Sequence, residues 1–217
     1  AGPEIGVAST KAFTAQLTVL ISLAIAIAEA KNEITVDQSN ELQRKIRLLP
    51  GLVGKTLDCF DVIKPIASGL KSASSALFLG RGYLFPIALE GALKLKELSY
   101  IHAEGFAAGE MKHGPIALIE EGLPVIALLA NDNLMEKVIS NLKEAAARGA
   151  RIILIADERA AVDIDFAADV VTVPAVDPLL APILLTIPVQ ILAYLTALDK
   201  GTDIDQPRNL AKSVTVE

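Results

Sequence analysis

The stretch ALFLGRGYLFPIALEGALKLKELS, at residues 76–99, decides the fold. Its first five residues form a short apolar run that is typical of a buried strand, and the run ends in Gly80-Arg81-Gly82. A helix follows over residues 85–99, since proline at position 86 is common in the first turn of a helix. A strand, a glycine turn and a helix in this order predict one unit of a parallel sheet covered by helices.

Similar units continue toward the C-terminus. Short apolar runs occur at residues 124–129, 151–156 and 169–173, and helical patterns occupy residues 133–148 and 181–198. Strands without polar alternation are typical of parallel sheets that are covered on both faces. The predicted fold class is therefore α/β, a doubly wound parallel sheet flanked by helices.

The region before this sheet is predicted to be helical. Residues 7–31 read as one long helix whose second half is apolar nearly all round and is therefore expected to be buried. Thr35 has capping-box spacing and opens a more polar helix, which we expect to stop before Pro50. A further helical stretch covers residues 53–70, with Pro65 as a break or first-turn residue.

Composition excludes several classes of protein. The net charge of −6 and the absence of tryptophan leave neither a basic patch nor a stacking platform, so we expect no nucleic-acid partner. Cys59 is the single cysteine, which rules out a disulfide within the chain and fits a reducing cytoplasm. It is interpreted as a small packed residue. No metal-ligand or nucleotide-binding pattern is present, and no cofactor is expected.

Two apolar segments are candidates for membrane spans, because the mean hydropathy of +0.47 is high. Residues 17–28 are uninterrupted but shorter than the roughly 20 residues that a bilayer requires. Residues 179–198 have the length, but Pro182, Pro188 and Gln190 interrupt them and no Lys/Arg cluster flanks them. Both segments are predicted to be packed helices, and no membrane partner is expected.

A stripe of charge lies on the helix over residues 85–99. Glu90, Lys94 and Glu97 stand at i, i+4 and i+7 and therefore share one face. The stripe fits a solvated row of salt bridges, which are common and individually weak. For a helix taken by itself, this solvated row is the favoured interpretation. The glycine turn fits either a tight strand-to-helix connection or a ligand approach.

The two histidines have different surroundings. His102 lies in a short extended segment and is interpreted as a core or interface residue. His113 precedes Gly114-Pro115, which fixes the backbone and exposes the ring. Near the N-terminus, Ser9 precedes the first long helix and is a candidate for its N-cap.

The last fifteen residues, 203–217, carry several polar groups close together after a long apolar segment. Pro207 fixes one backbone angle within them. Although many terminal segments fray, this composition predicts an ordered tail.

Three motifs together carry a family resemblance: ALEGALKLKE at residues 88–97, GEMKHGP at 109–115 and DQPRNLAKSVTVE at 205–217. They resemble the isomerase half of the glutamine:fructose-6-phosphate aminotransferase family, also called glucosamine-6-phosphate synthases. The resemblance covers the whole chain and is loose across residues 31–75. It implies that the sheet is the second sugar isomerase (SIS) domain of that half.

The resemblance also implies a division of the chain into four parts. The first is the C-terminal helix of a truncated first SIS domain, and the second is a helical connector. The third is the second SIS domain, and the fourth is an ordered active-site tail. Their expected boundaries are residues 1–34, 35–72, 73–202 and 203–217.

Site residues follow from the same resemblance. It implies that Glu97 moves a proton between C1 and C2 of the open-chain sugar and that Lys94 stabilises the charge beside it. Lys212 is implied to be catalytic. His113 is implied to open the sugar ring in the site of a neighbouring subunit, which predicts a homodimer. The residues implied to contact the sugar are Val7, Ser9 and Ala211.

The implied function is conversion of fructose-6-phosphate to glucosamine-6-phosphate with glutamine-derived ammonia, in the cytoplasm. The glutaminase domain and the Ser/Thr-rich phosphate loop of the family do not occur in these residues, so we expect the chain alone to lack full activity. One alternative is a regulatory SIS protein that senses a phosphosugar, and another is an SIS isomerase or deglycase. The tail argues against the second, and the joint presence of Glu97, His113 and Lys212 argues against the first.

Overall fold

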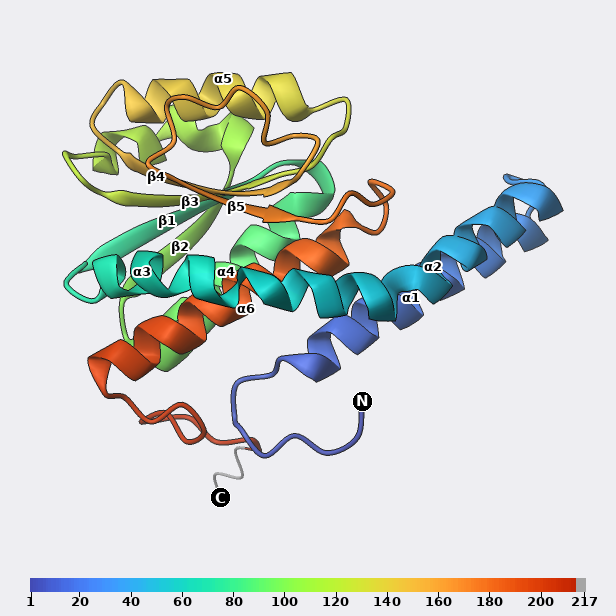
Figure 1. The fold of residues 1–217 in the computed structure, drawn as a ribbon, viewed down its shortest axis with the longest axis horizontal. Coiled ribbons are helices and arrows are strands. Elements are labelled where there is room, and N and C mark those ends of the chain that lie inside the picture. Colours follow the sequence, from blue (N-terminus) through green and yellow to red (C-terminus); the bar gives the residue numbers. More distant parts are fainter. Residues whose placement is uncertain (214–217) are drawn as a thin grey trace.

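The computed structural model describes residues 1–213. Helices alone form its first part, and strands and helices are interleaved from residue 75 to residue 200, as Figure 1 shows. The α-helices are α1 (Lys11–Ala30), α2 (Val36–Thr56), α3 (Phe60–Leu70), α4 (Phe85–Ser99), α5 (Met135–Ala146) and α6 (Ala181–Lys200). The strands are β1 (Ser75–Gly80), β2 (His102–Ala107), β3 (Pro124–Leu129), β4 (Arg151–Asp157) and β5 (Asp169–Val173). Short 3₁₀ turns are η1 (Leu57–Cys59), η2 (Gly82–Leu84), η3 (Ala108–His113) and η4 (Pro115–Leu118).

The five strands form one parallel sheet with the order β2-β1-β3-β4-β5. The predicted α/β fold class is confirmed, and the apolar runs at 124–129 and 169–173 coincide with β3 and β5. The central strand β3 is buried along its whole length, and β4 is buried except at its first residue, because helices cover both faces of the sheet.

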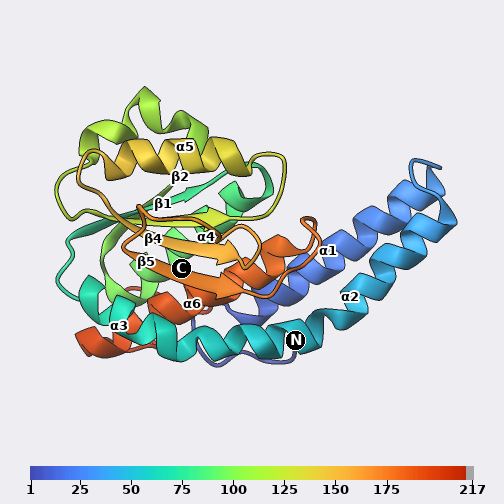
Figure 2. The ribbon, with the colours of Figure 1, turned by 45° about the horizontal axis from the view of Figure 1, so that its top comes forward.

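Helices divide between the two faces of the sheet. Helices α3, α4 and α6 pack against one face, and α5 with η3 packs against the other, as Figure 2 shows. Two separate apolar clusters fill the spaces between these layers. The arrangement places the charge stripe of α4 on the α6 side of the sheet.

Glycines allow the close approaches that this packing requires. A Cβ added at Gly80 would lie 2.2 Å from the carbonyl oxygen of Leu84, so the turn into α4 accepts no side chain there. A Cβ added at Gly105 would lie 2.9 Å from the Cα of Leu89, so glycine at this position allows β2 to lie close to α4. Chain packing therefore accounts for glycine at position 80 without a ligand.

Helices α1 and α2 form a hairpin that projects from the body (Figure 2). The expectation that the apolar half of this first helix is buried is wrong: Ile25 is its buried residue, while Val19 and Leu20 are 65% and 59% exposed. The physical reason is that α2 and α6 cover only part of its circumference. The helix also begins at Lys11, four residues later than predicted.

Two proline-based boundaries are also wrong. Helix α2 continues through Pro50 and α3 contains Pro65, because a proline removes one backbone donor while the neighbouring turns keep theirs. The start of α2 is as predicted. Thr35 Oγ1 accepts from the Gln38 amide at 3.2 Å, and the Gln38 side chain accepts from the Thr35 amide at 2.8 Å.

Among the described residues, α1 and α6 are both long and apolar enough to cross a membrane. The prediction that the first segment is too short is wrong, since the helix has 20 residues. In α6, 72% of the most apolar window is buried inside the protein, as expected for a core helix. In α1, 6% of the corresponding window is buried. Length and apolar composition alone therefore do not separate these helices from membrane spans.

His102 and Cys59 have opposite environments. His102 lies in β2, as the extended segment predicted, but its side chain is 69% exposed, so a core role is wrong. Strand β2 is an edge strand, which leaves side chains near its start open to solvent. Cys59 is packed as predicted, and burial raises the pKa of its thiol to about 11.

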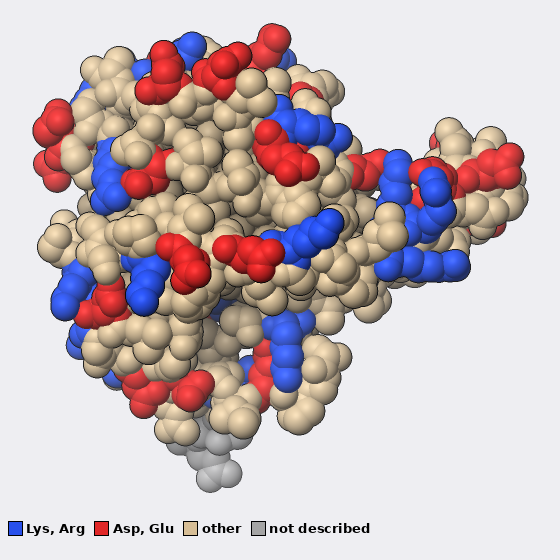
Figure 3. Space-filling view, in the orientation of Figure 1, with Lys and Arg blue, Asp and Glu red and all other residues tan. Residues whose placement is uncertain are grey.

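On the face of the molecule shown in Figure 3, acidic and basic side chains intermingle.

Candidate active site

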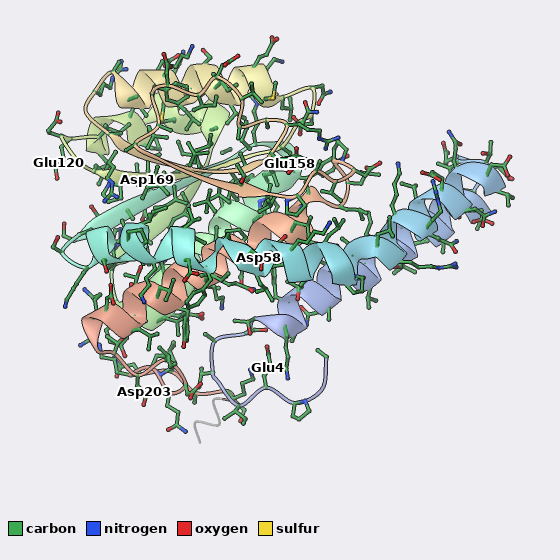
Figure 4. All side chains as sticks on the ribbon, in the orientation of Figure 1. Glu4, Asp58, Glu120, Glu158, Asp169 and Asp203 are labelled. Carbon is green, nitrogen blue, oxygen red and sulfur yellow. The ribbon has the colours of Figure 1, made fainter. Side chains whose placement is uncertain are left out.

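The segment after α6 folds back beside the N-terminal segment. The Val7 amide donates to the Asp205 carbonyl at 2.8 Å, which joins two segments from opposite ends of the sequence. Both lie below α6 in Figure 1, and Figure 4 labels Glu4 and Asp203 on them. Within the tail, Asp203 Oδ1 accepts from the amides of Asp205 and Gln206, and Pro207 is buried.

A pocket of ≈ 330 Å³ lies where these segments meet the body. The N-terminal segment supplies one wall through Glu4 and Gly6, and Asp205 adds the tail. Lys94 of α4 and Tyr194 of α6 form the opposite wall. Two helices, the N-terminal segment and the tail therefore converge on one cavity, which is a common arrangement for a small-molecule site.

The charge stripe of α4 is buried rather than solvated. Lys94 Nζ lies 2.5 Å from Glu97 Oε2 and 3.7 Å from Glu90 Oε1. The side chain of Lys94 is 4% exposed, whereas that of Glu97 is 21% exposed and so remains accessible. A cation beside an accessible carboxylate can hold that carboxylate in place and stabilise negative charge that develops nearby.

Glu90 is the second carboxyl group of the stripe and is also buried. Its Oε1 has no hydrogen-bond partner among the described residues. Burial raises the pKa of Glu90, and the negative charge of Glu97 raises it further, while Lys94 opposes both effects. Lys94 therefore has two carboxyl groups within reach, of which Glu97 is the closer.

Lys212 reaches the N-terminal segment from the tail. Its Nζ donates to the Gly6 carbonyl at 2.9 Å and contacts Glu4 Oε2 at 3.3 Å. The Val7 carbonyl lies 3.5 Å from the same nitrogen. The side chain of Lys212 is 47% exposed and lies outside the lining of the pocket, but it bonds two residues that line it, Glu4 and Gly6.

Glu4 organises this corner of the site, and no sequence pattern pointed to it. Its carboxylate accepts from the amides of Thr10 and Ala12 at 3.0 and 3.2 Å and from Ser9 Oγ at 3.1 Å. Partial burial opposes ionisation, but these hydrogen bonds and the one from Lys212 lower the pKa of Glu4 to about 2. Glu4 lies too far before α1 for the spacing of a capping box, so the sequence pattern does not predict that its carboxylate binds the first amides of the helix.

The expected cap by Ser9 is therefore wrong. Thr10 occupies the N-cap position of α1 and makes no side-chain cap, because the Glu4 carboxylate binds the free amides instead. Ser9 serves this arrangement by donating to Glu4.

The structure brings some predicted site residues together and leaves others apart. Lys94, Glu4 and Gly6 line the same pocket, and Lys212 forms hydrogen bonds with Glu4 and with Gly6. Ala211 is exposed beside Lys212. His113 is exposed at the end of η3, which packs with α5 on the opposite face of the sheet from α4. The predicted order of residues 214–217 falls outside the described residues.

A metal centre has no candidate in the described part of the chain, since no group of three or more His, Cys, Asp or Glu residues is suitably placed.

Comparisons with known proteins agree on the family of this fold. A profile of the SIS domain matches residues 69–199. A glutamine–fructose-6-phosphate aminotransferase (isomerising) from Zymomonas mobilis is 53% identical over 218 residues, which cover 100% of this chain and 36% of the relative. The chain thus spans about a third of the length of the curated relatives it matches.

Two solved structures are similar as well. The C-terminal domain of a glucosamine–fructose-6-phosphate aminotransferase from Francisella tularensis is 44% identical, with a TM-score of 0.91 over 94% of this chain and 58% of that one. A glucosamine-6-phosphate deaminase from Thermotoga maritima is 26% identical, with a TM-score of 0.71 over 97% of this chain and 58% of that one.

Proposed function

This chain belongs to the SIS domain family, and from that premise we propose that it is the C-terminal part of the isomerase half of a glutamine–fructose-6-phosphate aminotransferase. The whole protein would convert fructose-6-phosphate to glucosamine-6-phosphate with ammonia released from glutamine. The observation that carries the proposal is the convergence of Lys94, beside Glu97, and of the Lys212-bearing tail on one pocket. The similarity to aminotransferases over the whole chain supports it.

Glu97 is the proposed proton-transfer residue. Ammonia first replaces the C2 carbonyl oxygen as an imine, and the oxygen leaves as water. The Glu97 carboxylate then removes a proton from C1 while the imine nitrogen takes up a proton, which gives an enolamine with a C1=C2 double bond. As the C1 hydroxyl loses its proton and the C1 carbonyl forms, a proton is returned to C2, which leaves an amine at C2. Lys94, 2.5 Å from Glu97, holds the carboxylate and stabilises negative charge during the transfer.

Lys212 is the proposed second catalytic group, with the backbone at Val7 and Ala211 and the side chain of Ser9 lining the sugar. An amine near a ketose carbonyl can form an imine with it or stabilise the open chain. The contacts of Lys212 with the backbone at Gly6 and Val7 support its place beside the sugar-lining segment.

His113 is proposed to open the sugar ring in the site of a second subunit. Its position on η3, across the sheet from α4, supports the idea that it serves a neighbouring copy rather than its own chain. The functional protein is accordingly proposed to be a homodimer.

The four-part division of the chain fits this proposal. Residues 1–34 would end a preceding SIS domain, 35–72 would connect it to the second SIS domain at 73–202, and 203–217 would form the active-site tail. The exposed apolar face of α1 supports the first assignment, because a preceding domain would cover it. A glutaminase domain in the same full-length chain would supply the ammonia, and the cytoplasm is the proposed location.

The test is synthesis by the purified full-length protein. Fructose-6-phosphate and glutamine should yield glucosamine-6-phosphate and glutamate in equal amounts. A protein that binds the sugar phosphate but forms no product would instead support a regulatory SIS protein. Conversion of the sugar without any use of glutamine would support an SIS isomerase or deglycase.

A further inference from the structure

The end of α4 has an unusual residue for its conformation. Tyr100 follows the last residue of the helix with φ 61° and ψ 17°, the left-handed region. Glycine or asparagine normally occupies this position, because a bulky side chain is strained there. Backbone preference therefore does not explain why tyrosine occupies position 100. The contacts of its side chain provide the explanation.

Both groups of the Tyr100 side chain contact Arg208 in the tail. The phenol oxygen accepts from the backbone amide of Arg208 at 2.8 Å. The guanidinium carbon of Arg208 lies 4.1 Å from the centre of the ring, within the range of a cation–π interaction. We refer to this pair of contacts as the tail latch.

The tail latch is the last anchor before Lys212. Asp205 is bound to Val7, and Pro207 is buried. Between residues 206 and 211, the hydrogen bond from Arg208 to Tyr100 is the one that joins the tail to the rest of the described chain. Beyond it, Lys212 is held by its own contacts with the N-terminal segment.

The tail latch also connects the two halves of the proposed site. Tyr100 stands three residues after Glu97, at the end of the same helix, so its position relative to the Lys94–Glu97 pair is fixed. Arg208 stands four residues before Lys212. We propose that Tyr100 is a positioning residue that orders the tail and thereby sets where Lys212 lies relative to Glu97. This inference rests on the proposed function of Lys212.

Trypsin provides a readout that does not depend on activity, because it cleaves after Arg208. In the full-length protein, Tyr100→Phe removes the acceptor for the Arg208 amide and should raise the cleavage rate at Arg208–Asn209 about fivefold, the effect of one ordinary hydrogen bond. Tyr100→Asn suits the left-handed backbone but loses both contacts, so cleavage should rise further without loss of thermal stability. The matched control is Tyr83→Phe, at an exposed tyrosine.

Activity measurements separate positioning from general stability. Both Tyr100 variants should lower kcat for glucosamine-6-phosphate formation severalfold, while the KM for glutamine and its hydrolysis stay unchanged. Arg208→Lys keeps the backbone amide and the positive charge, so it should retain most of the activity.

Cleavage and turnover together decide the inference. Wild-type cleavage at Arg208–Asn209 in both Tyr100 variants would overturn it, and so would faster cleavage throughout the chain. Wild-type turnover in both variants, with Lys212→Arg inactive, would also overturn it. If Lys212→Arg is fully active, the proposed function of Lys212 fails, and protection at Arg208–Asn209 still decides whether Tyr100 orders the tail.

Discussion

At the scale of single residues, the α4 stripe illustrates how burial changes the meaning of a charge pattern. Exposed pairs at i, i+3 or i, i+4 stabilise a helix only weakly. Here Lys94 is almost completely buried between two carboxyl groups, while Glu97 retains access to solvent. A buried charge requires a partner, so the stripe holds the Glu97 carboxylate in a fixed place beside Lys94, which lines the pocket.

Replacement of Glu97 by glutamine tests its proton-transfer role. Glutamine keeps the shape of the side chain but cannot accept the proton, so glucosamine-6-phosphate formation by the full-length protein should fall about a hundredfold to ten-thousandfold. Glutamine hydrolysis should remain measurable, which controls for folding. Synthesis at the wild-type rate would remove Glu97 from the mechanism.

Lys212→Arg distinguishes amine chemistry from charge. Arginine keeps the positive charge and can still contact Glu4 and Gly6, but it forms no imine. Turnover should therefore be lost if the amine reacts, and borohydride with fructose-6-phosphate should then label the wild-type tail peptide. Lys200→Arg, at a partly exposed lysine that contacts the Lys71 carbonyl, is the matched control. Near-normal turnover in Lys212→Arg would leave the tail as a packing element.

At the scale of an element, the start of α1 depends on one carboxylate. Glu4 binds free amides at the beginning of the helix, a place where negative charge is favourable. Its pKa is lowered to about 2, against roughly 4.3 in an unfolded chain. The carboxylate therefore contributes stability fully above pH 4.3, and that contribution is lost as the pH falls toward 2.

Glu4→Gln tests this pH dependence, because the glutamine side chain does not ionise and its contribution to stability should not change with pH. Between pH 5 and pH 2, the stability of the wild type should fall more steeply than that of the variant, and at pH 7 the variant should be the less stable of the two. Acid unfolding of the full-length proteins measures both effects. Glu33→Gln, at an exposed position after α1, is the control. Parallel pH profiles for wild type and Glu4→Gln would contradict the assigned role.

At the scale of the whole molecule, a shared site predicts complementation. Full-length Glu97→Gln subunits lack the base and His113→Ala subunits lack the ring-opening group, so each homodimer should be inactive. In a mixed dimer, one of the two sites receives both intact residues, and part of the activity should return. Subunit exchange can be followed with differently tagged proteins. No recovery despite exchange would mean that each chain uses its own histidine.

Local sequence patterns predicted most of the sheet and fewer of the features around it. The runs that became β3 and β5 have intrinsic strand composition, and the helix over residues 85–99 matches α4 at both ends. The exposure of α1 was not predictable, because hydropathy reports that a face prefers burial and not which segment covers it. Pro50 and Pro65 failed as boundaries because tertiary packing outweighed a local preference.

The same distinction holds in the candidate site. The stripe on α4 follows from helical spacing, but its burial comes from packing against α6 and could not be read from the stripe itself. Glu4 and Tyr100 act through contacts with residues far away in the sequence or outside any common motif. Family resemblance supplied roles for Lys212 and His113 that no local pattern contained.

The uniformly parallel sheet has a consequence for how the chain folds. Neighbouring strands pair Ser75 with His102 and Pro124 with Arg151, so each pair forms only after an intervening helix has been brought back across the sheet. In such non-local pairing, the entropy of closing each loop is lost before the strand contacts contribute stabilising free energy. Refolding is therefore slower than for helical bundles or hairpins. Strand β1 pairs with both β2 and β3, and substitutions within it should therefore slow refolding more than equally destabilising substitutions in the edge strand β5.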